Sequence, residues 1–539
     1  MSAFGEEEED TNPNILAGYG ASSGRNGVVA YKSHDRSNWP AEWPSEQKFD
    51  SIQCDKGVKR NGDKLREGVI KALQLELHTI KFSDSSWWTE AFGTPVMDPQ
   101  LLIEIMKQKS YFDDKNLEEF YQARDRANPY ENCKKDIFIN RAAVKLMNID
   151  HLFKLTSSLR KDAGAGQLVC ADVCAGPGGF TEYMFWRMGP ERLLQFGMTL
   201  KGKHDFNLKN FHVRTYTLHH NRPENRFLRI YGPDRFSDGS VFVRENVMKL
   251  HSSIYSLGAA YEELKGVRSV DMLTCDGGDD VSHNYNMQEI ESKRLVLCQA
   301  IVALTIVRKG GHFVLKIFDS FSPFTVSVLY ILYTQFETFT IIKPYSSRPA
   351  NSERYVVCQN RVQYPAREAL MEHLWKAADA QGEVRVPTSH IAEFEDVASL
   401  VDPEVIKKDG DFLKYLRDTN DAIGKAQLQA LQDIQSCMED PDLVLRMPGL
   451  EERCIETWRA GGVDQSREMV TSEAFVEDRH PEGGKPQSLW FSGPKDERDA
   501  KAVRSRREWG VVPFIVQIKG ILSKAAVRRK AAPVRGKLG

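Results

Sequence analysis

The sequence lacks an excess of charge of either sign, because 73 lysines and arginines stand against 75 aspartates and glutamates in 539 residues. Affinity for a nucleic acid would therefore have to come from a local basic patch and not from the net charge. The sequence also lacks any apolar run long enough to span a bilayer, and acidic residues 6–10 stand where a signal peptide needs an apolar core. We expect a soluble globular protein that does not contact a membrane.

Paired cysteines and metal-ligand clusters are also missing. The nine cysteines are scattered without a Cys-x-x-Cys motif, and several lie in apolar runs. This pattern is typical of the reduced, buried cysteines of an intracellular protein. No group of histidine, cysteine and carboxylate residues has the spacing of metal ligands, so no metal is expected.

The most informative stretch is 168–183, in which an apolar run turns through glycines into a helix. Glycines in such a strand-to-helix turn let a ligand approach the backbone closely. The spacing is not the dinucleotide-binding Gly-x-Gly-x-x-Gly, and no Lys-Ser/Thr of a phosphate loop follows. A nucleoside without a pyrophosphate remains, and S-adenosylmethionine is the commonest such cofactor. The alternative at this point is a glycine-rich turn with no ligand.

Strand and helix patterns alternate beyond this turn, as in a doubly wound α/β sheet. Strands are expected at 168–173, 193–200, 238–243, 270–275, 312–318, 338–342 and 354–358. The last two are expected to form a hairpin, as in the Rossmann-like sheet of class I S-adenosylmethionine-dependent methyltransferases, here with flanking helical segments. We divide the chain into a disordered acidic and polar leader (1–80), a catalytic domain (81–362), a helical C-terminal part of the catalytic region (363–460) and an unassigned basic tail (461–539).

Four charged residues lie in apolar runs or at strand ends: Lys145, Asp276, Lys316 and Glu353. A buried lysine must find carboxylate partners, and the carboxyl ends of the strands are where doubly wound sheets bind ligands. A lysine with a lowered pKa can accept the proton of a ribose 2′-hydroxyl and so activate a poor nucleophile. Two unrelated salt bridges are the alternative interpretation.

These four residues resemble the Lys-Asp-Lys-Glu tetrad of the FtsJ-like (RrmJ-like) RNA ribose 2′-O-methyltransferases. Four longer motifs are similar to the eukaryotic branch that methylates capped mRNA to give cap 1: 138–145, 172–180, 196–202 and 347–358. The resemblance runs from about 85 to 460. It implies Lys316 as the general base, Asp276 and Lys145 as the residues that orient it and the hydroxyl, and Glu353 as the completion of the charge network.

The resemblance also implies binding residues. The pocket for S-adenosylmethionine falls on Asn140, Cys174, Ala175, Gly176, Pro177, Gly178, Gly179 and Phe180, with adenine read at Ser240 and Val241. The family tends to have an acidic residue where Ser240 stands, so Asp238 is an alternative reader. Contacts to the capped 5′ end fall on Lys109, Ser110, Tyr111, Phe112, Asp113, Arg124 and Asn351.

The implied activity is methyl transfer to the ribose 2′-hydroxyl of the first transcribed nucleotide of capped mRNA or pre-mRNA. It implies a nuclear protein with partners in the transcription or capping machinery. Three alternatives stay open: a 2′-O-methyltransferase of the second cap nucleotide or of ribosomal or transfer RNA, a catalytically inactive cap-binding scaffold, and a base methyltransferase. The base methyltransferase rests on the sequence Asn-Pro-Tyr-Glu at 128–131, which is similar to an amino-group methyltransferase motif.

Overall fold

The computed structural model describes most of the chain between residues 91 and 459. Outside this description within that range are 134–137, 164–166, 190–191, 213–225, 261–266, 279–287, 363–366, 384–392 and 448; before it, residues 52–53, 66–67, 69, 71 and 73–81 are described. The tail at 461–539 and most of the expected leader lie outside the described residues. Within the described part, no helix combines the length and apolarity needed to cross a membrane.

The centre of the fold is an eight-stranded sheet with the order β1-β8-β9-β7-β6-β3-β4-β5. Its strands are β1 (Ile52–Gln53), β3 (Leu168–Val173), β4 (Leu193–Met198), β5 (Phe227–Arg229), β6 (Val270–Cys275), β7 (Val307–Ile317), β8 (Phe336–Ile342) and β9 (Arg354–Arg361). Strands β3 to β7 pair in parallel, whereas β8 and β9 pair antiparallel and β9 also runs antiparallel to β7. The expected α/β sheet with a terminal hairpin is confirmed.

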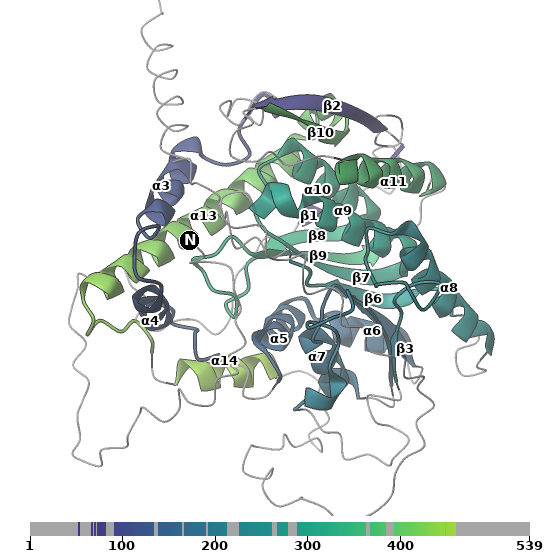
Figure 1. Ribbon diagram of the computed structural model, residues 1–539, viewed down its shortest axis with the longest axis horizontal. Coiled ribbons are helices and arrows are strands. Elements are labelled where there is room, and N and C mark those ends of the chain that lie inside the picture. Colours follow the sequence, from purple (N-terminus) through teal and green to yellow (C-terminus); the bar gives the residue numbers. More distant parts are fainter. Residues whose placement is uncertain are drawn as a thin grey trace, which may run out of the picture.

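Helices cover both faces of this sheet (Figure 1). On one face lie α8 (Arg244–Ala260), α9 (Gln288–Ile306), α10 (Pro323–Gln335) and α11 (Arg367–Glu383). On the other lie α5 (Arg141–Phe153), α6 (Leu155–Ala163), α7 (Gly179–Met188) and α14 (Leu450–Arg459). Each layer has its own buried apolar cluster: Leu273 and Leu315 belong to the first, Met272 and Val314 to the second. The sheet is therefore buried on both faces, which explains its nearly continuous apolar strands.

Three further helices form a third apolar cluster at the side of the sheet (Figure 1). They are α3 (Pro99–Ser110), α4 (Leu117–Ala127) and the long α13 (Gly410–Glu439), which follows the short α12 (Pro403–Lys407). Phe112, Phe120 and Leu431 are buried in this cluster together with Ala350, which lies in the loop between β8 and β9. This packing connects that loop to the helical side of the molecule.

One of the expected strands needs correction. Residues 238–243 are not a strand; β5 at Phe227–Arg229 takes the third place beside β4. The Asp238 carboxylate accepts a hydrogen bond from the Ser240 backbone at 2.9 Å, and Gly239 has a φ of +82°. Asp238 thus closes a local turn that competes with strand pairing.

A two-stranded sheet joins the expected leader to the expected helical C-terminal part. Strand β2 (Leu73–Lys81) pairs antiparallel with β10 (Glu393–Val401), with Leu77 opposite Val397. Buried Arg66 donates a hydrogen bond from Nε to the Thr334 carbonyl at 2.8 Å. Residues 66–81 therefore include ordered structure, and the assignment of a disordered leader up to residue 80 was wrong there. The apolar alternation of Leu73, Leu75 and Leu77 suits a strand whose pairing partner lies far along the chain.

Candidate active site

The four charged residues of the expected tetrad form two ion pairs. Lys145 Nζ lies 3.0 Å from Glu353 Oε2, and both side chains are buried, at 3% and 7% exposure. Lys316 Nζ lies 3.3 Å from Asp276 Oδ1, and these side chains are slightly more open, at 13% and 11%. The second pair is therefore better placed to meet a substrate.

Strand register brings these pairs to one edge of the sheet. Asp276 directly follows β6, Lys316 is the penultimate residue of the neighbouring parallel strand β7, and Glu353 directly precedes antiparallel β9. Lys316 lies opposite Tyr355, and directly opposite residues point to the same face. Glu353, two residues before Tyr355, shares that face. The Lys145 side chain reaches it from α5, which covers the same side of the sheet.

Two residues that the sequence interpretation missed support the tetrad carboxylates. The Tyr355 hydroxyl donates to Asp276 Oδ1 at 2.8 Å, and the Ser347 hydroxyl donates to Glu353 Oε1 at 2.5 Å. Both lie inside the 347–358 motif, so their sequence signal was the motif itself. These hydrogen bonds hold each carboxylate towards its lysine.

The glycine turn lies beside the Lys316–Asp276 pair. A Cβ added to Gly277 would stand 2.8 Å from Cys174 Cβ, so the turns after β6 and β3 are in close contact. A Cβ on Gly176 would stand only 1.8 Å from the His204 carbonyl oxygen, and Gly178 has a φ of +116°. The turn therefore requires glycine at the carboxyl end of β3, the edge at which doubly wound sheets bind ligands.

The other expected residues of the cofactor pocket border the same turn. Asn140 caps α5 through a hydrogen bond from the Ala142 backbone, and a Cβ on Gly179 would meet its Oδ1 at 2.0 Å. Phe180 is 1% exposed and lies 6.3 Å from the Tyr355 ring, so its side chain belongs to the core. Cys174 is partly exposed, with a left-handed φ of +57°. Ala175 and Pro177 belong to the same turn, which connects β3 to α7.

Ser240 and Val241 lie in space beside the carboxyl end of β4, where the resemblance places the adenine. A Cβ on Gly239 would stand 2.0 Å from the Thr199 carbonyl oxygen, which places this segment against the residue after β4. Asp238 Oδ1 accepts from the Ser240 backbone and from Asn246 Nδ2 at 3.2 Å. The Oδ1 atom of Asp238 is thus engaged by Ser240 and by Asn246 of α8.

A further carboxylate, Asp172 near the end of β3, is completely buried. The hydroxyls of Thr274 and Thr181 donate to it at 2.6 and 2.7 Å. Burial, with a smaller contribution from the Asp276 carboxylate, raises the pKa of Asp172 to about 7. About half of the Asp172 carboxyl groups are therefore protonated at pH 7, unlike those of an ordinary aspartate.

We expect the Asp172→Asn substitution to remove a pH-dependent cost of folding. A carboxyl whose pKa is raised in the folded state loses stability as the pH rises from its unfolded value towards 7, by up to about 1.4 kcal/mol per pH unit. The free energy of unfolding of the variant should therefore gain roughly 2 kcal/mol on the wild type between pH 5 and pH 7. Urea unfolding at the two pH values measures this difference. A difference that does not change with pH would contradict the raised pKa.

The expected contacts to the capped end lie on the helical side of the molecule. Lys109 is 7% exposed; burial lowers its pKa, and the Asp319 carboxylate opposes that shift. Phe112 is a core residue at 2% exposure, so only its backbone is available to a ligand. Ser110, Tyr111 and Asp113 flank it at the end of α3 and in the following turn, and all three are at least partly exposed.

Asn351 belongs to the loop between β8 and β9, and Arg124 of α4 lies near the same loop. The Arg124 guanidinium bonds the Asp125 carboxylate at 3.1 Å and lies 4.7 Å from the Tyr121 ring. Its pKa is lowered by burial and, to a smaller extent, by Arg348, which places the two guanidiniums near each other. Each of these guanidiniums is paired with a carboxylate, Arg124 with Asp125 and Arg348 with Glu131.

The Asn-Pro-Tyr-Glu sequence at 128–131 has a structural use. Buried Glu131 accepts hydrogen bonds from Arg141 at 2.6 Å and from Arg348 at 3.0 Å, and burial is outweighed by these two cations, so its pKa falls to about 2. Asn128 donates to Glu131 at 2.8 Å and accepts from the Tyr130 backbone at 3.1 Å. Its amide is occupied, so the geometry does not support the base-methylation alternative. Among the described residues, no group of three or more potential ligands could hold a metal ion.

A glycine turn next to paired lysines and carboxylates at the carboxyl edge of a doubly wound sheet is the arrangement of a methyltransferase domain. Residues 138–361 match the family of FtsJ-like methyltransferases, and the chain contains a domain of this family, as its motifs predicted.

The chain is also similar in sequence to proteins named cap-specific mRNA (nucleoside-2′-O-)-methyltransferase 1. The protein of that name from Danio rerio is 37% identical over 369 residues, and the one from Homo sapiens 38% over 385 residues. The one from Drosophila melanogaster is 33% identical over 437 residues. These matches cover 66%, 69% and 78% of this chain but only 42%, 43% and 52% of the relatives, so the chain spans about half the length of the proteins it matches.

Proposed function

We propose that this protein transfers a methyl group from S-adenosylmethionine to the ribose 2′-hydroxyl of the first transcribed nucleotide of a 5′-capped RNA. The observation that carries the proposal is the Lys316–Asp276 pair, 3.3 Å apart and partly open, next to the glycine turn after β3. The names of the relatives support the capped substrate. The methyltransferase family itself implies only a methyl donor, and the turn fits a nucleoside donor without a pyrophosphate.

The proposed chemistry uses Lys316 as the general base. S-adenosylmethionine, when bound, supplies an electrophilic methyl group. Lys316 accepts the proton of the 2′-hydroxyl while the hydroxyl oxygen forms its bond to the methyl carbon and the bond from that carbon to the sulfonium sulfur breaks, and Asp276 holds the lysine in place. The buried Lys145–Glu353 pair fixes α5 against the start of β9, which orients the hydroxyl. Positioning and proton transfer are then the contributions of the protein.

The capped 5′ end is proposed to lie between the glycine turn and helices α3 and α4. The triphosphate bridge of a cap is densely negative, and Lys109, Arg124 and Arg348 supply positive charge on that side. Nuclear location and partners in the transcription or capping machinery belong to the same proposal. They rest on the kinship with cap methyltransferases.

The test is methyl transfer from labelled S-adenosylmethionine to a short capped RNA and to its uncapped twin, followed by nuclease mapping. We expect label on the ribose of the first nucleotide of the capped RNA only. Label at the second nucleotide, or inside both RNAs, would replace the proposal with one of the related 2′-O-methyltransferase activities. Cap binding without any transfer would make the protein a cap-binding scaffold.

A further inference from the structure

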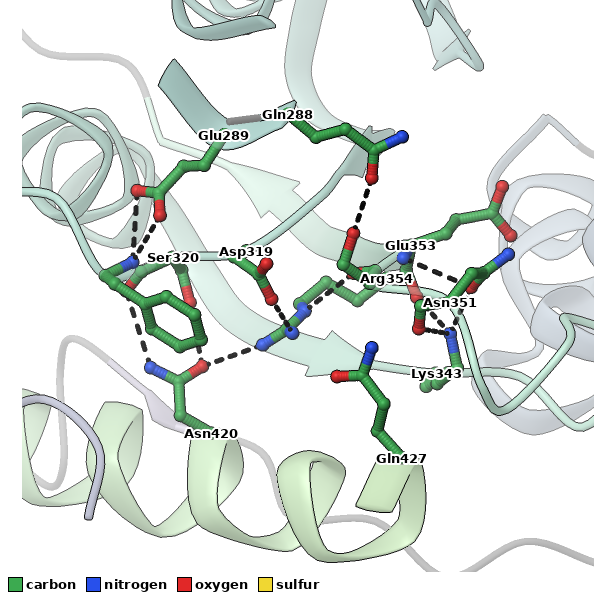
Figure 2. A network of polar contacts seen from close by, with 12 residues as sticks. Gln288, Glu289, Asp319, Ser320, Lys343, Asn351, Glu353, Arg354, Asn420 and Gln427 are labelled. Atoms are coloured by element: carbon green, nitrogen blue, oxygen red, sulfur yellow. Dashed lines mark hydrogen bonds and ion pairs between the residues drawn. The ribbon is translucent and has the colours of Figure 1, made fainter. Parts of the chain in front are cut away.

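One lysine outside the tetrad fastens the loop that carries Asn351 and Glu353. Lys343 directly follows β8, and its Nζ donates to the Glu353 carbonyl at 2.6 Å, to Asn351 Oδ1 at 2.7 Å and to the Asn351 carbonyl at 2.9 Å (Figure 2). Burial lowers the pKa of Lys343 to about 7, with the Glu353 carboxylate opposing that shift. Three acceptors around one nitrogen match the three N–H groups of its ammonium form.

These contacts determine which way the Asn351 amide faces. Its Oδ1 also accepts from the Glu353 backbone N–H at 3.2 Å. A backbone N–H can only donate, so the atom that receives it must be the amide oxygen and not the nitrogen. Both lone pairs of Oδ1 are then used by Glu353 and Lys343. The Nδ2 group of Asn351 has no protein acceptor among the described residues, and the side chain is partly exposed.

The loop around this amide is held on both sides. The Ala350 carbonyl accepts from Gln427 Nε2 of α13 at 3.0 Å, and the Ser352 hydroxyl donates to Gln288 at 2.8 Å. Figure 2 shows Lys343, Asn351 and Glu353 on one side of Arg354, with Asn420 and Gln427 projecting from a helix below. The amide is therefore part of a rigid unit that includes the tetrad carboxylate Glu353.

We infer that Lys343 is a positioning residue that locks the Asn351 amide with its N–H groups available to the substrate, so that this site selects a hydrogen-bond acceptor on the capped 5′ end. The inference rests on the proposed function and deepens it. Lys343 acts only through the loop. It occupies the amide oxygen and so leaves a hydrogen-bond donor, and no acceptor, for the substrate.

Isosteric replacement of Asn351 tests the polarity of the site. Asn351→Asp exchanges the free donor for an acceptor while keeping an oxygen for Lys343 and for the Glu353 backbone. We expect the Kd of capped RNA to rise about tenfold to a hundredfold in Asn351→Asp, and less in Asn351→Ala, because only the aspartate repels an oxygen acceptor. A variant Asn351→Asp that binds capped RNA as tightly as wild type would overturn the inference. The capped and uncapped RNAs of the activity test are both measured, and only the capped one should respond.

Lys343→Met tests the positioning role, and Lys293→Met is its matched control. Lys293 is buried, whereas Lys343 is partly exposed; Lys293 lies on α9 and covers the Phe324 ring at 4.8 Å on the opposite face of the sheet. At pH 6.5 we expect Lys343→Met to raise the Kd of capped RNA about tenfold, and Lys293→Met to leave it within twofold. Binding of S-adenosylmethionine by each variant reports on its folding.

A double-mutant cycle separates positioning from general damage. If Lys343 acts through Asn351, Lys343→Met should not raise the Kd of capped RNA further once Asn351 is alanine. Fully additive effects, or a loss of kcat with an unchanged Kd, would overturn the inference. Wild-type protein that methylates no capped RNA would instead refute the proposed function, because that result does not depend on either variant.

Discussion

Replacing Lys316 by methionine should lower kcat for methyl transfer by roughly 10³-fold, within the range of about 10²–10⁴ that a general base contributes. The methionine fills similar space but cannot accept the proton of the hydroxyl. Asp276 then loses the partner 3.3 Å away but keeps the hydrogen bond from Tyr355, so the site should keep its shape. The Kd of S-adenosylmethionine should stay within a few-fold of wild type.

The Lys316→Arg substitution tests whether Lys316 acts as a general base or only through its positive charge. Arginine keeps the positive charge beside Asp276 but does not deprotonate in proteins, so it cannot serve as a base. We expect Lys316→Arg to be nearly as inactive as Lys316→Met in single-turnover transfer to capped RNA. Lys309→Met is the control, because Lys309 lies exposed on the same strand, β7. An arginine variant with more than a tenth of wild-type activity would assign Lys316 an electrostatic role.

Gly176→Ala should abolish donor binding, with the Kd of S-adenosylmethionine rising at least about a hundredfold. The added Cβ would stand 1.8 Å from the His204 carbonyl oxygen and 2.9 Å from its carbonyl carbon. Both atoms are backbone, so no side-chain rotation relieves the overlap, and either the turn or the 204–207 segment has to move. The Asn207 backbone donates to the Pro177 carbonyl at 2.9 Å, so a shift of one displaces the other.

Gly410→Ala provides the matched control for this substitution. A Cβ at Gly410, the first residue of α13, meets nothing within 4 Å. Calorimetric titration with S-adenosylmethionine, together with the thermal midpoint of each variant, separates a damaged pocket from an unfolded protein. Donor binding by Gly176→Ala within twofold of wild type would mean that the glycine turn is not the donor site.

The strands could be predicted from sequence where burial on both faces makes them continuously apolar. This applies to β3, β6 and the second half of β7, whose apolar runs match the described strands. Residues 238–243 gave the wrong prediction because a side-chain hydrogen bond to Asp238 makes a local turn more favourable than pairing. The pairing of β2 with β10 joins residues more than 300 positions apart, and a local pattern contains no information about such a partner.

The candidate site, like the fold, could be predicted from the sequence only in part. Lys145 and Lys316 stand out in the sequence because a charge in an apolar run needs a partner, and each lysine has one. The sequence did not tell which carboxylate pairs with which lysine, since that depends on the register of β7 and β9. Lys343 gave no signal at all, because a lysine in a polar loop is ordinary until the fold surrounds its ammonium group with three acceptors.

The long helix α13 has a consequence for the limits of the folding unit. It lies beyond residue 361, where the match to the methyltransferase family ends, yet it contributes Gln427 to the Ala350 carbonyl and Asn420 to buried Arg354 at 2.9 Å. A fragment cut at the family limits would lose both contacts and expose the apolar cluster around Leu431. The folding unit is thus larger than the segment that matches the family, and α13 is a structural support of the loop that carries Glu353.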